Sequence, residues 1–360
     1  TKWLQGEPVD NFEKGRVYVV EFWATWCGPC VAIMPHVADL QKEYRDKGVT
    51  VIGFSAADPN NSAEKVAGFI KKRGPKLGYT FAFADNRDTF DAYMKAAKQN
   101  GIPCSYVVGK DGKLAFIGHP AFLDYVLPRV LAGTWDPKEG AAEVARADAD
   151  FDKAYAAVRG KDVEQGLKAL SELEEKRPAL ADSVYFSVPR ITLLIRAKKF
   201  EEARAAADKA ITKACVQEDP LVLRQASIAL RVPAVQGEKA LLALAVKAVD
   251  AFVRIDGDQD PASLLIASET HAAAGDATQA KEYSRKALAV AEAAVAAEGT
   301  KPTSVTMFHL AETYFATGDL AKAKEWGAKA VEAAPNQAQK DAYRRAMEKY
   351  DGTEGKGRDK

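Results

Sequence analysis

Cysteine and histidine are scarce in this chain, with four of each among 360 residues. So few cysteines exclude a scaffold stapled together by many disulfides. Charge of one sign is also lacking, because 51 Lys and Arg residues nearly balance 50 Asp and Glu residues. With a net charge of +1 and no basic stripe, nucleic acid is not an expected partner.

Long hydrophobic runs are absent as well. No stretch of 18 or more apolar residues occurs, so we predict no membrane span in this chain. The chain begins at Thr1 without an initiator Met or an apolar leader, and we expect a mature segment from which a signal or anchor has been removed. The length suits two domains, each large enough to bury a core.

The most informative segment carries two cysteines three positions apart, Cys27 and Cys30. An apolar, β-branched run over 17–22 precedes them and predicts a buried strand, while the pattern over 31–44 predicts an amphipathic helix. Cys27 therefore lies at a helix start, where unpaired N–H groups favour a thiolate. We predict Cys27 as the exposed attacking nucleophile and Cys30 as the deeper resolving thiol.

The residues around the two cysteines suit this chemistry. Pro29 needs no intrahelical donor in a first turn, and Gly28 lets a partner chain approach the sulfurs. We expect Trp26 to cover the surface of the dithiol and Trp23 to lie in the core.

A structural zinc site is the alternative for two cysteines at this spacing, but it requires two further ligands. We predict no metal site, because the remaining candidates are scattered along the chain: Cys104, Cys215, His36, His119, His271 and His309. His119 precedes Pro120 and is predicted to be a loop or cap residue.

The Trp-Cys-Gly-Pro-Cys motif, followed far downstream by Gly101-Ile102-Pro103, resembles the thioredoxin superfamily. The chain is most similar to its TlpA/ResA-like redoxin branch over residues 1–133. The resemblance implies a thiol-disulfide oxidoreductase with Pro103 in a cis bond beside the dithiol. It also implies a substrate groove formed by Trp26, Gly28, Pro29, Ile102 and Pro103.

The fold implied for this part is an α/β thioredoxin-like domain with a mixed central sheet flanked by helices. Between the dithiol helix and Pro103 we predict two strands, 50–55 and 80–83, and two helices, 62–72 and 88–98. A hairpin with an Asp-Gly turn follows over 105–118, and a helix over 121–131 closes the domain.

Two residues of this domain leave alternatives open. Glu21 occupies a strand position where thioredoxins carry a buried acid, so we predict that it relays the proton of Cys30, with burial raising its pKa. The alternative is a carboxylate in water at the strand end. Cys104, after Pro103, is either a small half-buried residue or a third redox thiol.

The composition changes after residue 133. We predict a linker over 134–146, an all-α solenoid resembling tetratricopeptide (TPR) repeats over 147–350, and a flexible tail over 351–360. The clearest copy runs from Met307 through Gly318 to Pro335, and an earlier copy begins near Leu264. An unspecialised helical bundle is the alternative.

The leading hypothesis for function is reduction of protein disulfides by the Cys27-Cys30 dithiol, with no cofactor besides this redox-active pair. The expected partners are protein disulfide substrates, an upstream electron donor, and a peptide or protein on the TPR surface. Alternatives are a TPR protein-interaction scaffold with a regulatory or vestigial redox domain, and a thiol peroxidase, for which the surrounding motif is missing. The resemblance implies an extracytoplasmic location; a cytoplasmic one is the alternative.

Overall fold

The computed structural model describes residues 1–351. It divides the chain into two compact units, Thr1–Leu193 and Leu194–Lys360. The flexible tail predicted over 351–360 lies, from residue 352 onward, outside the described residues. No helix within the described range is long and apolar enough to cross a membrane.

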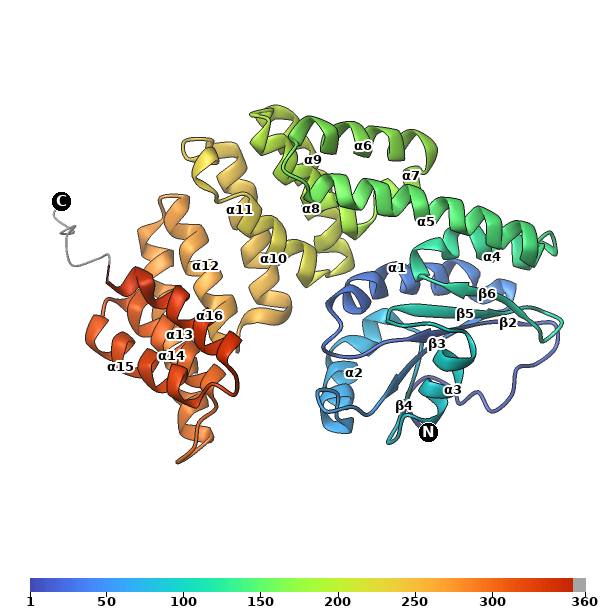
Figure 1. The fold of residues 1–360 in the computed structure, drawn as a ribbon, viewed down its shortest axis with the longest axis horizontal. Coiled ribbons are helices and arrows are strands. Elements are labelled where there is room, and N and C mark those ends of the chain that lie inside the picture. The colour runs from blue at the N-terminus through green and yellow to red at the C-terminus, as the bar shows by residue number, and fades with distance from the viewer. Residues whose placement is uncertain (352–360) are drawn as a thin grey trace. The chain divides into compact units, whose positions relative to one another are not determined.

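A six-stranded mixed sheet organises the first unit (Figure 1), in the order β1-β4-β3-β2-β5-β6. The pairs β2–β3 and β3–β4 are parallel, and the other three pairs are antiparallel. The strands are β1 (Lys2–Gln5), β2 (Val17–Phe22), β3 (Val49–Ala56), β4 (Thr80–Ala84), β5 (Cys104–Val108) and β6 (Leu114–Gly118). The predicted strands are confirmed, while β1, an edge strand of only four residues, was not predicted.

Successive side chains of β2 point to opposite faces of this sheet and enter two different core layers. Val17 and Val19 join the core layer of α1 (Gly28–Tyr44), α2 (Ala63–Leu77) and α4 (Leu123–Ala132). Tyr18, Val20 and Phe22 face the layer of α3 (Asp88–Ala96). The α/β class with helices on both faces is therefore as predicted.

The helices that follow the sheet continue the same core. They are α5 (Pro137–Arg159), α6 (Val163–Lys176), α7 (Pro178–Ala181) and α8 (Val184–Arg196). Leu170 and Phe186 lie in one hydrophobic cluster with Val107 and Leu127 of the α/β layer. The first unit therefore ends 60 residues beyond the predicted boundary at 133.

The linker predicted over 134–146 is wrong for most of its length, because α5 occupies it. Asp136 caps that helix by accepting hydrogen bonds from the backbone N–H groups of Lys138 and Glu139, and Pro137 is its first residue. The Asp-Pro pair that suggested a connection is instead a helix start.

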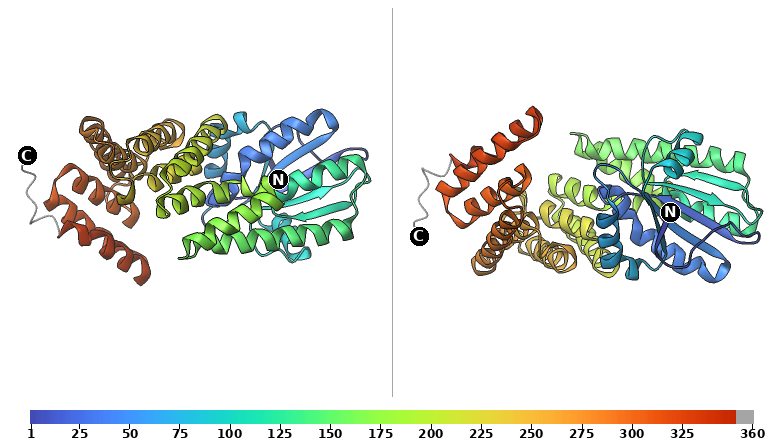
Figure 2. Two further views of the ribbon diagram at one scale, coloured as in Figure 1. Left: turned by 90° about the horizontal axis from the view of Figure 1, so that it is seen from above. Right: turned by 90° about the horizontal axis from the view of Figure 1, so that it is seen from below.

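The second unit is entirely helical over its described residues, as predicted. Its helices are α9 (Phe200–Gln217), α10 (Pro220–Ala229), α11 (Lys239–Phe252), α12 (Pro261–Ala273), α13 (Ala277–Ala297), α14 (Ser304–Thr317), α15 (Leu320–Ala333) and α16 (Gln337–Met347). Short 3₁₀ turns occur at Pro233–Val235 and Glu348–Tyr350, and a π turn occurs at Val253–Gly257. Consecutive helices such as α12 and α13, or α14 and α15, lie side by side (Figures 1 and 2).

Two turns between helices of the second unit are built from the same pair of residues, a Gly followed by an Asp. Gly275 and Gly318 adopt positive φ angles of 86° and 90°, which end the preceding helices, α12 and α14. The next residues, Asp276 and Asp319, then cap α13 and α15 by accepting N–H groups from the new first turns. Small buried residues such as Ala323 allow each pair to pack closely, which is the repeat pattern expected of TPR helices.

Candidate active site

A disulfide joins Cys27 and Cys30 at the start of α1, with an S–S distance of 2.02 Å and a Cα–Cα distance of 5.2 Å. Cys27 is the N-cap residue of this helix, and its Sγ accepts the backbone N–H of Cys30 at 3.2 Å. A negative charge on this sulfur would face the unpaired N–H groups and positive dipole end of the helix. The helix start therefore favours a thiolate at residue 27 once the disulfide is reduced.

Burial distinguishes the two cysteines less than predicted. Cys30 is 0% exposed, as expected of the deeper residue, but Cys27 is only 4% exposed. The prediction of an exposed nucleophile is wrong for this disulfide form, because Sγ of Cys27 lies 3.7 Å from the carbonyl oxygen of Ile102. The Ile102–Pro103 bond is cis, as the resemblance implied.

A buried asparagine holds the segment that leads into the dithiol. The side-chain oxygen of Asn61 accepts hydrogen bonds from the backbone N–H and the hydroxyl of Thr25, at 2.9 and 2.8 Å. The amide nitrogen of Asn61 donates to Oγ of Ser55 and to the carbonyl of Ala56, at the end of β3. Sequence reasoning missed this contact, because Asn61 lies among polar residues that indicated an ordinary loop.

The two tryptophans lie as predicted. Trp23 is 1% exposed and packs against Phe69 and Phe81, whereas Trp26 is 54% exposed beside the disulfide. The indole N–H of Trp26 donates to a carboxylate oxygen of Asp58 at 2.9 Å, which fixes the ring orientation.

A cavity of about 520 Å³ opens next to Trp26. Trp26 and Ile102, two of the predicted groove residues, line it together with Ala24, Asp58, Arg87 and Phe90. Gly28 and Pro29 are exposed in the first turn of α1, and Pro103 is half-buried. The space is large enough for several side chains of a bound peptide.

The profile of the redoxin family matches residues 3–124 of this chain. The first part of this chain is a redoxin domain of the thioredoxin superfamily. A TPR profile matches residues 243–336, which extend from within α11 through α15. The second unit of the chain therefore carries TPR repeats.

Curated relatives resemble the redoxin part. Protein FixW of Rhizobium leguminosarum is 34% identical over 137 residues, which cover 37% of this chain and 62% of FixW. The thiol-disulfide oxidoreductase ResA of Bacillus thuringiensis subsp. konkukian is 30% identical over 112 residues, which cover 31% of this chain and 60% of ResA. The chain thus spans about three-fifths of the length of these relatives.

Solved structures are also similar to part of this chain. A thiol-disulfide isomerase from Corynebacterium glutamicum is 23% identical to this chain, with a TM-score of 0.32. That match covers 38% of this chain and 92% of the isomerase.

Glu21 is a buried acid of the redoxin domain. Its side chain is 0% exposed, and neither carboxylate oxygen has a hydrogen-bond partner among the described residues. Burial raises the pKa of Glu21 from 4.5 to about 8. The alternative of a solvated carboxylate at the strand end is therefore wrong, and the predicted rise in its pKa is confirmed.

Cys104 faces away from the disulfide. Its side chain belongs to the core layer that contains Phe22 and Met94, while Cys27 and Cys30 belong to the opposite layer. Burial raises the pKa of the Cys104 thiol to about 11, so it stays protonated at neutral pH. These observations favour the reading of Cys104 as a small buried residue.

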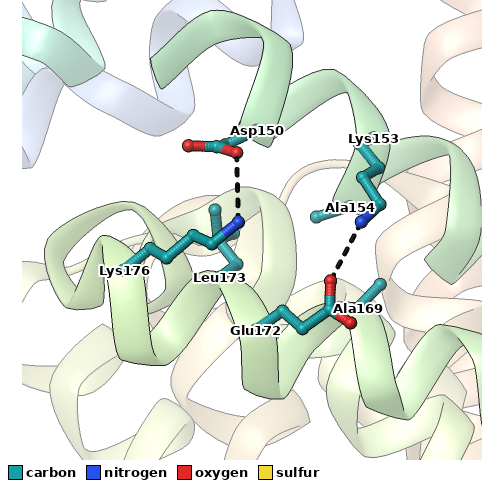
Figure 3. Close-up of a pocket in the computed structure, with 7 residues that line it drawn as sticks. All are labelled: Asp150, Lys153, Ala154, Ala169, Glu172, Leu173 and Lys176. Carbon is teal, nitrogen blue, oxygen red and sulfur yellow. Dashed lines mark hydrogen bonds and ion pairs between the residues drawn. The ribbon is translucent and has the colours of Figure 1, made fainter. Parts of the chain in front are cut away.

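Within residues 1–351, no group of three or more His, Cys, Asp or Glu residues is arranged to hold a metal ion. A hollow between α5 and α6 measures about 10 Å³, about the space of a single water molecule (Figure 3). Ion pairs from Lys153 to Glu172 at 2.9 Å and from Lys176 to Asp150 at 3.8 Å cross it, so it joins the two helices.

Proposed function

We propose that this protein is a thiol-disulfide oxidoreductase that reduces disulfides in other proteins. The observation that carries the proposal is the Cys27–Cys30 disulfide at the start of α1, with Sγ of Cys27 accepting a helix N–H. The redox group is this dithiol itself, and the proposal needs no further cofactor.

The reaction consists of two exchanges. The thiolate of Cys27 attacks one sulfur of the substrate disulfide, forms a mixed disulfide and releases the other substrate sulfur as a thiolate. Cys30 then loses its proton and attacks Sγ of Cys27, which releases the second substrate sulfur and leaves the Cys27–Cys30 disulfide. An upstream donor returns two electrons and two protons to begin the next cycle.

We propose that the carboxylate of Glu21 accepts the proton that the Cys30 thiol loses before it attacks Cys27. The side chain of Glu21 shares a face of β2 with Val17 and Val19, which contact the same core layer as Cys30. A carboxyl pKa of about 8 lies close to the ordinary pKa of a thiol, about 8.5, so a proton can pass between the groups in either direction. Resolution should therefore accelerate as the pH rises toward 8.

Insulin reduction, followed by the turbidity of the released chain, tests the activity. The parent protein should reduce insulin in the presence of a thiol donor, and the Cys27→Ser variant should not. Cys30→Ser should accumulate mixed disulfides with its substrates, because resolution is blocked. Equal activity of the parent and Cys27→Ser would refute the proposal.

The TPR repeats suggest how clients are selected. We propose that the second unit binds a peptide or protein and raises its local concentration near Cys27. Proteins trapped as mixed disulfides by Cys30→Ser should then be fewer when residues 199–360 are removed. An unchanged set would exclude recruitment by this unit.

Location outside the cytoplasm, which the resemblance implied, is part of this proposal. Fractionation of cells that carry the natural gene measures it, and recovery of the protein in the cytoplasm would contradict it.

A further inference from the structure

Glu21 lies in a row of paired residues that crosses the sheet and contains one other polar side chain, that of Ser105. The register pairs Glu21 with Gly53 of β3 on one side and with Ser105 of β5 on the other, and Ser105 with Gly118 of β6. Paired residues of neighbouring strands point to the same face, about 4.8 Å apart. Like Glu21, Ser105 is completely buried, and its hydroxyl has no hydrogen-bond partner among the described residues.

The row ends at His119, which directly follows Gly118. The backbone N–H of Ala121 donates to Nδ1 of His119 at 3.1 Å, which confirms the predicted role as a cap. Burial lowers the pKa of His119 to about 4, so the imidazole is neutral at physiological pH. Because Nδ1 accepts a hydrogen bond, the single ring proton lies on Nε2.

That proton has an acceptor in the helical segment beyond the redoxin match. Nε2 of His119 lies 2.9 Å from the hydroxyl oxygen of Tyr185, in α8. Since the imidazole donates this bond, the hydroxyl proton of Tyr185 remains available for another acceptor. Burial raises the pKa of Tyr185 and the negative charge of Glu21 raises it further, so the two groups interact electrostatically.

Aromatic packing fixes the position of Tyr185. Its ring makes edge contacts with His119 at 5.3 Å and with Phe151 of α5 at 5.5 Å between centroids. Phe151 also stacks on Tyr155 and contacts Phe186. A ring held in this way keeps its hydroxyl oxygen in one position at no further entropic cost.

We propose that Tyr185, oriented by His119, is a positioning residue for the Glu21 proton relay, so that α8 is a working part of the redox centre. The inference rests on the proposed function. The proposal places the free hydroxyl proton of Tyr185 on the side of Glu21, where its dipole would favour the carboxylate and offset part of the effect of burial. The chain segment beyond the redoxin match thereby sets the pH at which Cys30 can lose its proton.

The charge of Glu21 also acts on a second tyrosine. Tyr79, which precedes β4, is completely buried without a hydrogen-bond partner among the described residues, and it interacts with the charge of Glu21. Tyr155 of α5 acts on Tyr185 in turn. A pH profile therefore reports the whole cluster of Glu21, Tyr79 and Tyr185, and the variants must separate their contributions.

The experiment uses the reduced full chain, in a Cys215→Ser background, and 5,5′-dithiobis(2-nitrobenzoate). Release of the first chromogenic thiol reports the attack by Cys27, and release of the second reports resolution by Cys30. Both rates are measured from about pH 6 to about pH 9, an interval that brackets the pKa of about 8 at Glu21.

Tyr185→Phe should move the midpoint of the second step upward by about one pH unit and slow it up to about tenfold at neutral pH. The first step should keep its rate. His119→Asn, which retains an acceptor for the N–H of Ala121, should move the midpoint in the same direction by less. It also provides a second test if Tyr185→Phe folds poorly.

Tyr155→Phe is the matched control, because it makes the same change in the same aromatic cluster. The hydroxyl of Tyr155 accepts a hydrogen bond from Arg159 and makes no bond to His119. An unmoved midpoint in Tyr185→Phe, or an equal movement in Tyr155→Phe, would overturn the inference. If Glu21→Gln leaves the midpoint in place, the relay itself is wrong, whereas the Cys27→Ser assay on insulin still decides the proposed function.

Discussion

The side-chain oxygen of Asn61 accepts two hydrogen bonds from Thr25, one from the backbone N–H and one from the hydroxyl. Because the amide nitrogen of Asn61 also bonds to the end of β3, this side chain connects the loop before Cys27 to the sheet. Asn61 and Ser55 are both 0% exposed, so water does not reach the hydrogen bond between these two side chains.

Asn61→Ala should therefore lower the free energy of unfolding by about 3 kcal/mol, since it leaves several buried polar groups without partners. Urea denaturation of the oxidised protein measures the change. The neighbouring Asn60→Ala is the control, because the side chain of Asn60 is exposed and its observed hydrogen bonds use backbone atoms. Equal stability of the two variants would show that Asn61 does not anchor the loop.

The raised pKa of Glu21 also predicts how stability depends on pH. A carboxyl group with a pKa of 4.5 when unfolded and about 8 when folded binds more protons in the native state. The contribution of the protonated Glu21 carboxyl group to the free energy of unfolding is fully present below about pH 4.5, and it is lost as the pH rises through about 8. The total loss is about 5 kcal/mol.

Glu21→Gln should remove this dependence and make the protein more stable than the parent near pH 8. Thermal unfolding of both proteins between about pH 5 and about pH 8.5 tests this, in the range set by the two pKa values. If the parent and Glu21→Gln lose stability in parallel, Glu21 does not ionise over this range.

The parts of the site that could be predicted from the sequence are local. Cys27 and Cys30 follow a buried strand and open a helix, a pattern contained within about 30 residues. The burial of Glu21 was implied by the resemblance to thioredoxins, whereas the strand pattern alone left open a solvated carboxylate at the strand end. The positions of these residues depend only on the side-chain pattern of one strand and on the first turn of one helix.

The contacts that could not be predicted join distant segments. His119 and Tyr185 are 66 positions apart, and neither has a local pattern that indicates the other. The helix start at Asp136-Pro137 did carry a signal, since Asp favours the N-cap position and Pro the first turn. Tertiary packing then decided that α5 to α8 join the redoxin core, which helical periodicity alone does not indicate.

Gly53 offers a test of close packing beside Glu21. A Cβ atom at this position would lie 2.7 Å from ring atoms of Phe81 and 3.1 Å from the ring of Tyr79. Because Phe81 is completely buried, Gly53→Ala should lower the free energy of unfolding by about 2 kcal/mol.

Gly68→Ala is the comparison for this variant. Gly68 lies within α2, where a Cβ would contact nothing within 4 Å, and the change should stabilise the protein by about 0.5–1 kcal/mol. Thermal or urea unfolding should therefore move in opposite directions for the two glycine variants. A Gly53→Ala protein as stable as the parent would mean that the rings of Tyr79 and Phe81 shift without cost.

The extent of the first unit predicts where the chain can be cut. A fragment of residues 1–198 keeps α5 to α8, whereas a fragment of residues 1–140 loses Leu170, Leu173 and Phe186 from the shared hydrophobic cluster. Burial of each such side chain contributes about 1.5–3 kcal/mol, so the shorter fragment should unfold at a much lower urea concentration. It should also show faster backbone amide exchange in β6, because Phe116 of β6 belongs to the same cluster. If both fragments unfold at the same urea concentration, the redoxin domain does not depend on the helices that follow it, and its boundary lies near residue 133 after all.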